Sequence, residues 1–297
     1  MNQEPLVSIL TPSFNQDKYI QANLDSVSQQ DYGRVEHVVM DGGSTDGTIE
    51  LLRAAAESNS RLSWRSEPDR GQAHALGKAF EMSTGSIVGW LNSDDAYVAE
   101  NTIRKVVKYF ADHPGIDIVY GHSAWIGADG QVLLLRRAPK YSLSRLRRYD
   151  FICQPAAFMR RSSIESGFVD ESMHFAMDYE LWLRLGSLGH EFGRINEVVA
   201  VDREHAARKT GHLLEEYARN HATLKSKYHI AYGDHWYGLM LRLRGWSGRL
   251  SGLTLIGNLP RRLVYGGRSI SAYRLLARHL FTSSSVLRDR AHREAQD

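Results

Sequence analysis

Hydrophobic residues along the first 120 positions alternate between two spacings, which predict strands and helices in turn. Short apolar runs predict strands, and apolar residues three or four positions apart predict the helices between them. The predicted strands are 6–11, 35–41, 62–67, 86–92 and 116–120. The predicted helices begin near Ile20, Ile49, Gln72 and Thr102. Strands that alternate with helices in this way form a parallel sheet covered on both faces.

After residue 120 the pattern loses this regularity. The glycine-containing connection Ala128-Asp129-Gly130 predicts a hairpin between two short strands. Leu181, Leu185 and Leu188 recur at helical spacing and form the apolar face of an amphipathic helix. In order, the predicted elements are hairpin strands 124–126 and 132–135, a loop-like stretch 137–175, a helix 178–188, a strand 195–201 and a helical region from 206.

The composition is that of an ordinary soluble globular protein, with 42% hydrophobic and 24% charged residues. The single cysteine, Cys153, excludes an intramolecular disulfide framework and a cysteine-based zinc site, and it fits a reducing compartment. The first residues lack the basic and apolar regions of a secretory signal, and no run of about eighteen apolar residues predicts a membrane span. We therefore expect a cytoplasmic protein.

Charge divides the chain into two parts. Residues 1–202 have a formal net charge of −7 and residues 203–297 one of +10, which together give +3. An acidic body beside a basic tail predicts two surfaces with different partners. The tail mixes arginine with leucine and aromatic residues over 236–281. Three interpretations fit this tail. It forms helices that pack on the rest of the protein, or residues 230–297 make a peripheral contact with an anionic membrane. The third is nucleic-acid binding, for which no recognised module is present.

Carboxylates follow three neighbouring strands of the predicted sheet. Asp41 ends the second strand, Asp69 follows the third, and Asp94 and Asp95 follow the fourth. In an open α/β sheet, ligands bind at the carboxyl ends of the strands, so these side chains mark a candidate site. Asp is also a common turn and helix-capping residue, which is the competing explanation for any one of them.

The adjacent Asp94 and Asp95 favour a bound cation. Two neighbouring carboxylates repel each other unless a positive charge lies between or beside them. A divalent ion with oxygen ligands removes this repulsion and commonly bridges to phosphate oxygens, so the pair predicts Mg²⁺ or Mn²⁺ beside a diphosphate. His205, after the last strand, is a candidate imidazole ligand of the same ion, although an isolated histidine is more often a surface residue.

A further carboxylate, Asp178, opens the predicted helix 178–188. The helix dipole alone favours an acid at a helix N-terminus. The alternative is a general base directed at an acceptor hydroxyl. Glu180 is its rival, but two positions further along a helix its side chain points away from whatever Asp178 faces.

Five segments together resemble the family 2 glycosyltransferases, in that family's order and approximate spacing. They are 5–15 (PLVSILTPSFN), 38–48 (VVMDGGSTDGT), 67–71 (EPDRG), 90–95 (WLNSDD) and 177–182 (MDYELW). The resemblance implies a GT-A fold, with a Rossmann-like, mixed but mostly parallel sheet flanked by helices. It implies a catalytic domain at 1–205, with a donor half at about 1–122 and an acceptor half at about 123–205, before a basic helical region at 206–297.

The resemblance also implies an inverting transfer from a nucleoside-diphosphate sugar to an acceptor hydroxyl. Asp178 would be the catalytic base, and Asp95 would hold the metal at the diphosphate. The residues on the donor side would be Thr11, Pro12, Phe14, Asp41, Asp69, Ser93 and Asp94. Gln154 lies where related enzymes build the acceptor side, although a buried edge strand would explain the rest of segment 154–158.

Two departures from the family pattern bear on the substrates. Family members often have an acid, an asparagine and a glycine where this chain has His74, Gly77 and Ala79, which leaves the donor sugar open. The Gln-x-x-Arg-Trp signature of polymerising members is absent, which predicts the addition of one sugar per encounter. We expect a saccharide or lipid-linked saccharide acceptor in cell-surface polysaccharide assembly, at the inner face of the membrane.

Two other functions fit parts of the pattern. A sugar-nucleotide pyrophosphorylase uses a similar nucleotide-binding sheet, but residues 11–15 (TPSFN) replace the Gly-rich, Arg-containing loop of that class. A catalytically inactive sugar-nucleotide or glycan-binding module is the other alternative. The presence of all four carboxylates, Asp41, Asp94, Asp95 and Asp178, argues against it.

Overall fold

The computed structural model describes residues 4–164, 167–173, 175–206, 208 and 214–230 of the 297-residue chain. The chain divides into two units, Met1–Ile230 and Ala231–Asp297, and every described residue belongs to the first. The predicted membrane-contacting region, 230–297, therefore lies outside the described residues except for Ile230. No helix in the described ranges has both the length and the apolar character that a bilayer span requires.

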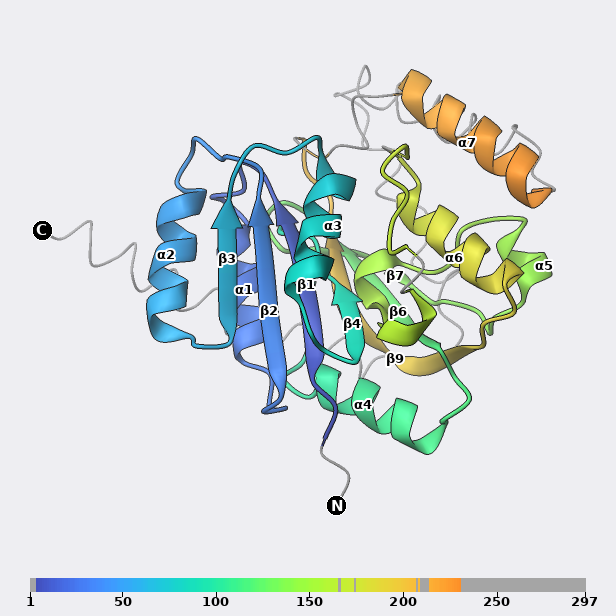
Figure 1. Ribbon diagram of the computed structural model, residues 1–297, viewed down its shortest axis with the longest axis horizontal. Helices are drawn as coiled ribbons and strands as arrows, with labels where there is room; N and C mark the ends of the chain where they lie inside the picture. Colours follow the sequence, from blue (N-terminus) through green and yellow to red (C-terminus); the bar gives the residue numbers. More distant parts are fainter. Residues whose placement is uncertain (1–3, 165–166, 174, 207, 209–213, 231–297) are drawn as a thin grey trace, which may run out of the picture. The chain divides into compact units, whose positions relative to one another are not determined.

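A mixed, mostly parallel sheet of nine strands forms the centre of the described unit (Figure 1). Its strand order is β3-β2-β1-β4-β8-β6-β9-β5, and β7 pairs with β6. Strands β1 to β4 are parallel, β6 is parallel to β9, and β8 runs antiparallel to both of its neighbours. The strands are β1 (Val7–Ser13), β2 (Val35–Asp41), β3 (Leu62–Ser66), β4 (Ile87–Trp90), β5 (Ala96–Tyr97), β6 (Ile118–Ile126), β7 (Val132–Arg136), β8 (Ala157–Arg160) and β9 (Phe192–Arg203).

Helices cover the sheet because each has one apolar stripe. Val27 of α1 and Phe110 of α4 share a core with Ile9 and Phe158 of the sheet. Helix α3 packs against β1 and β2, and Figure 1 shows it in front of the sheet, with α1 behind. The helices are α1 (Ile20–Ser28), α2 (Thr48–Ser58), α3 (Gln72–Met82), α4 (Thr102–Asp112), α5 (Leu143–Leu146), α6 (Met177–Ser187) and α7 (Leu214–Tyr228), with short 3₁₀ turns η1 (Gln154–Ala156) and η2 (Arg161–Ser163).

The predicted α/β fold is confirmed, but three expectations for the second half are wrong. The predicted strands 116–120 and 124–126 are one strand, β6, whose pairing with β9 shifts register around His122 and so interrupts the alternation of polar and apolar residues. The loop-like stretch contains β8, a strand inside the sheet and not at its edge. Leu188 is 65% exposed because α6 ends at Ser187, one residue before it.

The parallel strands place their carboxyl ends at one edge of the sheet. Strands β1, β2 and β4 end there, and β6 and β9 run in the same direction because β8 is antiparallel to both β4 and β6. The turn after β4, the loop after β2 and the segment after β9 therefore meet at this edge. It is the edge where open α/β sheets bind their ligands.

Gly89, in β4, has no room for a side chain. A Cβ there would lie 2.9 Å from the ring of Phe158 and 3.0 Å from Ile9 Cδ1, and both of these side chains are fully buried. We expect Gly89→Ala to lower the free energy of unfolding by about 1–3 kcal/mol, as overpacking does. Gly33→Ala is the matched control, since a Cβ at Gly33 meets nothing within 4 Å. Urea unfolding of the two variants would contradict the packing argument if both were as stable as the parent chain.

Candidate active site

Asp41, the last residue of β2, organises the loop that follows it. Its carboxylate accepts hydrogen bonds from the main-chain N–H groups of Gly43 and Ser44 at 3.0 and 2.8 Å, and from the hydroxyls of Ser44 and Ser66 at 2.5 and 2.7 Å. Gly43 has a φ of 84°, a conformation that favours glycine. With both oxygens engaged and only 1% of the residue exposed, Asp41 shapes the donor-side loop, and its bond to a nucleobase stays a prediction.

Phe14 and Asp69 approach each other above this loop. A Cβ on Gly42 would lie 2.8 Å from Asp69 Oδ2 and 3.4 Å from the ring of Phe14, so the two side chains flank the same glycine. Phe14 is 58% exposed, and Asp69 Oδ1 accepts the N–H of Gly71 at 2.7 Å. An exposed ring offers a stacking surface for a base, and a carboxylate oxygen beside it can accept a hydrogen bond. The structure thus brings two predicted donor-side residues together.

Thr11 and Pro12 lie in β1 and are buried. The Thr11 hydroxyl is 2.9 Å from His37 Nε2, inside the sheet. Burial lowers the pKa of His37 to about 3, so the imidazole is neutral at physiological pH. Of the three predicted residues on this strand and its end, only Phe14 has an exposed side chain.

The turn after β4 is bonded to the end of β9. Asp95, which is 2% exposed, accepts the N–H of Arg203 at 3.0 Å and a bond from the Asn92 amide at 3.3 Å. Asp94 Oδ2 lies 2.9 Å from His205 Nε2, and the Arg203 side chain donates to the main-chain oxygen of Asp94 at 3.0 Å. The structure therefore brings Asp94, Asp95 and His205 together, although the direct partner of His205 is Asp94.

A buried carboxylate on β9, Asp202, joins this group. Asp202 accepts a hydrogen bond from the indole of Trp125 at 2.7 Å and forms an ion pair with Arg208 at 2.7 Å. Burial, and then repulsion from Asp94 and Asp202, raises the pKa of Asp95 well above its usual range, and Arg208 opposes this effect. The sequence pattern did not single out Asp202, although this carboxylate stands next to the end of a largely buried strand, much as Asp41 ends β2.

Asp95 and His205 stay candidate ligands of a divalent cation, and a diphosphate would have to complete its coordination. Within the described residues, no group of three or more His, Cys, Asp or Glu side chains forms a complete metal cage. Mg²⁺ usually takes one or two protein carboxylates and fills its remaining positions with water and substrate phosphates. Asp95 is a buried carboxylate that two other carboxylates repel. Carboxylate oxygens are ligands that such an ion prefers.

An amide network lies against this turn. Asn92 Oδ1 accepts bonds from the Trp90 indole at 2.8 Å and from Gln72 at 2.7 Å, and its Nδ2 donates to Gln154 Oε1 at 2.8 Å. The Gln154 amide donates in turn to the main-chain oxygen of Trp90. Gln154 and Ser93 are both buried, so the structure places them among the supports of the turn. Their contacts with acceptor and donor stay predictions.

Asp178 is the second residue of α6, and the charge of Asp202 acts on it as well. Burial, and then repulsion from Asp202, raises the pKa of Asp178, while the N–H of Tyr179 at 2.9 Å and the charge of Arg136 oppose the shift. Burial, and then repulsion from Asp178, also raises the pKa of Asp150, a residue that the sequence did not single out. Because Asp202 acts on both Asp95 and Asp178, the candidate metal ligand and the candidate base belong to one electrostatic cluster.

Glu180 faces away from this cluster, as predicted. It is fully buried and accepts bonds from Arg184 at 3.1 Å, Lys227 at 3.0 Å and the Tyr228 hydroxyl at 2.5 Å. These bonds join α6 to α7. Glu180 therefore has a structural role, and Asp178 stays the candidate base of this helix.

The positions that depart from the family pattern lie close to one acidic residue. His74 accepts the main-chain N–H of Arg70 at 3.1 Å, and Arg70 forms an ion pair with Glu171 at 2.6 Å. A Cβ on Gly77 would lie 3.6 Å from Glu171 Oε1. Glu171 therefore lies over the segment that the sequence links to the choice of donor sugar.

Comparison with known protein sequences finds similarity to glycosyltransferases. Residues 8–168, more than half of the chain, match the profile of glycosyl transferase family 2. The hyaluronan synthase of Pasteurella multocida is 29% identical over 67% of this chain, and a PGL/p-HBAD biosynthesis glycosyltransferase of Mycobacterium bovis is 30% identical over 53%. The chain spans 20% and 60% of the lengths of these relatives. An uncharacterized glycosyltransferase of Mycobacterium tuberculosis is 25% identical over 96% of this chain and 95% of its own length.

Solved structures show the same fold. The Staphylococcus aureus TarS fragment in complex with UDP-GlcNAc matches with a TM-score of 0.58 at 18% identity, over 70% of this chain and 61% of that one. The mannosyltransferase PcManGT from Pyrobaculum calidifontis, in complex with GDP-Man and Mn²⁺, matches with a TM-score of 0.57 at 26% identity, over 74% and 65%. The GT-A fold is therefore confirmed, and by its sequence profile the chain belongs to glycosyl transferase family 2.

Proposed function

We propose that this protein moves one sugar from a nucleoside-diphosphate sugar to an acceptor hydroxyl with inversion, using Asp178 as the base and a divalent ion held at Asp95. The observation that carries the proposal is the place of Asp202 near the end of β9: its neighbour Arg203 donates its N–H to Asp95 at 3.0 Å, and Asp202 lies 3.7 Å from Arg136, whose charge acts on Asp178. The carboxylate suited to a diphosphate-bound cation and the carboxylate suited to proton removal thus border one site.

The donor side rests on the exposed ring of Phe14, the Asp69 carboxylate and the loop that Asp41 organises. The relatives of known structure support a nucleotide-sugar donor, since TarS was solved with UDP-GlcNAc and PcManGT with GDP-Man. PcManGT also contained Mn²⁺, which supports the choice of a divalent ion. His205 would assist Asp95 as a ligand, by exchanging its bond to Asp94 for the ion.

The proposed chemistry is a single displacement. The ionised carboxylate of Asp178 takes the proton of the acceptor hydroxyl as that oxygen bonds to the anomeric carbon. The bond from the anomeric carbon to the diphosphate oxygen breaks on the opposite face, through an oxocarbenium-like transition state. When bound, the divalent ion neutralises charge that builds on the departing diphosphate. Arg203 and Arg208 hold further positive charge beside Asp94 and Asp95.

A saccharide acceptor in polysaccharide or glycolipid assembly is part of the proposal, with a lipid-linked saccharide as its preferred form. It is supported by relatives named hyaluronan synthase, chondroitin synthase and PGL/p-HBAD biosynthesis glycosyltransferase. Family membership favours a transferase over a pyrophosphorylase. The remaining alternative, an inactive binding module, differs in predicting no turnover at all.

Asp178→Asn should remove transfer while leaving donor binding nearly intact. A general base contributes roughly 10²–10⁴ in rate, so we expect a loss of about that size in acceptor-dependent release of nucleoside diphosphate. Binding of UDP and GDP with Mn²⁺, measured by calorimetry, should change less than about twofold. Asp112→Asn, an exposed carboxylate on α4, serves as the control. Residual turnover combined with lost nucleotide affinity would move the base to another residue.

The acidic limb of the pH–rate profile should lie above the range of an ordinary aspartate. Asp178 works only when ionised, and its pKa is raised, so the rate falls as pH drops through that raised value. The carboxylate that repels Asp178 is Asp202, so Asp202→Asn should lower the pKa of Asp178 and move the limb of kcat/KM to lower pH. Asp170→Asn, a loop carboxylate bonded to Ser172, should leave the limb in place. A limb that does not move in Asp202→Asn would exclude this coupling.

Asp95→Ala should abolish metal-dependent nucleotide binding. Without this carboxylate the ion loses its most buried candidate ligand, while the Phe14–Asp69 surface persists. Calorimetric titration of UDP or GDP into the variant, with Mn²⁺ and then with chelator, should give the same weak affinity in both conditions. An unchanged response to Mn²⁺ would show that Asp95 is not the ligand.

A further inference from the structure

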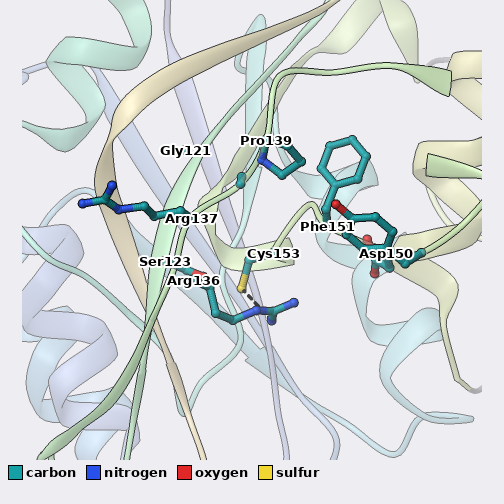
Figure 2. Close-up of a pocket in the computed structure, with 10 residues that line it drawn as sticks. Gly121, Ser123, Arg136, Arg137, Pro139, Asp150, Phe151 and Cys153 are labelled. Atoms are coloured by element: carbon teal, nitrogen blue, oxygen red, sulfur yellow. Dashed lines mark hydrogen bonds between the residues drawn. The ribbon is translucent and has the colours of Figure 1, made fainter. Parts of the chain in front are cut away.

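A cavity of about 260 Å³ opens between β6, the end of β7 and residues 149–153 (Figure 2). It is smaller than the roughly 300–1,000 Å³ of pockets that hold drug-sized ligands, and therefore suits a group such as one sugar ring. All of its lining residues except Gly121 lie in the predicted acceptor half, 123–205. None of the predicted site residues lines it.

The start of α6 is bonded to the segment that precedes the lining residues 149–153. Tyr179, the neighbour of Asp178, donates its hydroxyl to the main-chain oxygen of Leu146 at 2.6 Å, three residues before Tyr149. Asp150 lines the cavity and lies close enough to Asp178 for the two carboxylates to repel each other. A ligand in the cavity would therefore border the proposed base.

The cavity combines an aromatic surface with a carboxylate. Tyr149 is 41% exposed, and its ring meets that of Phe151 edge to face, with centroids 5.7 Å apart. Asp150 stands between these two residues in the sequence and accepts the N–H of Ile152 at 3.2 Å. An aromatic ring packs against the C–H face of a sugar, and a carboxylate accepts bonds from its hydroxyls.

Charge around the cavity disfavours an anionic ligand. Arg136 points toward Asp150 and Phe151 in Figure 2, whereas the Arg137 side chain points the opposite way. Arg136 lies 3.7 Å from Asp202 Oδ2, and its charge also acts on Asp150 and Asp178. One arginine thus faces three carboxylates. Cys153, 3.7 Å from Arg136, adds no charge, because burial raises the pKa of its thiol far above neutrality.

We propose that this cavity binds the terminal sugar of the acceptor, that this sugar is uncharged, and that Tyr149 and Asp150 determine its recognition. The inference rests on the proposed function, since the sugar in this cavity would supply the acceptor hydroxyl to Asp178. Tyr149 packs against the ring and Asp150 accepts its hydroxyls. A carboxylate- or phosphate-bearing sugar is rejected, because Arg136 is already balanced by Asp202 and Asp150.

The test measures sugar binding to the full chain with UDP or GDP and Mn²⁺ present. The probes are methyl glycosides of neutral hexoses and of the corresponding uronic acids. Their binding is measured by ligand-observed NMR titration. At least one neutral glycoside should bind, and its uronic acid counterpart at least about tenfold more weakly. Tyr149→Ala and Asp150→Asn should each weaken the neutral glycoside about tenfold, the size of one lost charge-assisted hydrogen bond or aromatic contact.

Two matched variants control for indirect effects. Tyr149→Phe keeps the ring and should bind within about threefold of the parent chain. Arg137→Gln removes a charge whose side chain points away from Asp150, and should bind as the parent does. Thermal melting checks the fold of each variant. If Asp150→Asn does not fold, Tyr149→Ala at the exposed rim still decides the outcome.

The inference is overturned if uronic acids bind as tightly as neutral glycosides, or if Tyr149→Ala binds normally. It is also overturned if UDP or GDP binds and every glycoside fails. Failure of the proposed function gives a different result, in which neither nucleotide binds with Mn²⁺ or Asp178→Asn retains full transfer. If glycosides bind and nucleotides do not, the proposed sugar site stands and the proposed transferase function is wrong.

Discussion

The carboxyl edge of this sheet depends on how four neighbouring carboxylates are accommodated, of which Asp95 and Asp202 are buried and Asp178 and Asp150 are half-buried. Asp95, Asp202, Asp178 and Asp150 lie near enough for each to influence another, and Arg136 and Arg208 supply the nearest balancing charges. Burying like charges is unfavourable, so the arrangement depends on hydrogen bonds from the main chain and on cations. In the proposed reaction the same cost would favour a metal ion at Asp95 and the transfer of a proton to Asp178.

Parallel strands bring their carboxyl ends to one edge of a sheet, and this explains which parts of the site the sequence could predict. Asp41, Asp94 and Asp95 each follow an apolar run that ends in a turn, and parallel strands bring such ends to one edge. His205 could be placed beside them because it follows another parallel strand. The general fold was predictable for the same reason, since α/β alternation up to residue 112 is regular and leaves few topologies.

The rest depended on contacts that no local pattern encodes. Strand β8 has four residues, too few to show alternation, and its central place arises from pairing with β4 and β6. Asp150 lies in an irregular segment, and its importance comes from Asp178, 28 positions away. Gln154 was assigned to the acceptor, but its bonds to Asn92 and Trp90 show a supporting contact that only the folded chain reveals.

The bonds of Glu180 join the last described helix to the helix that carries Asp178. Lys227 and Tyr228, at the end of α7, both bond to this buried carboxylate of α6. Without α7 the Glu180 carboxylate would keep the bond from Arg184 but lose these two donors, and a buried charge with fewer partners is costly. The contact between the two helices is therefore part of what keeps α6 stable.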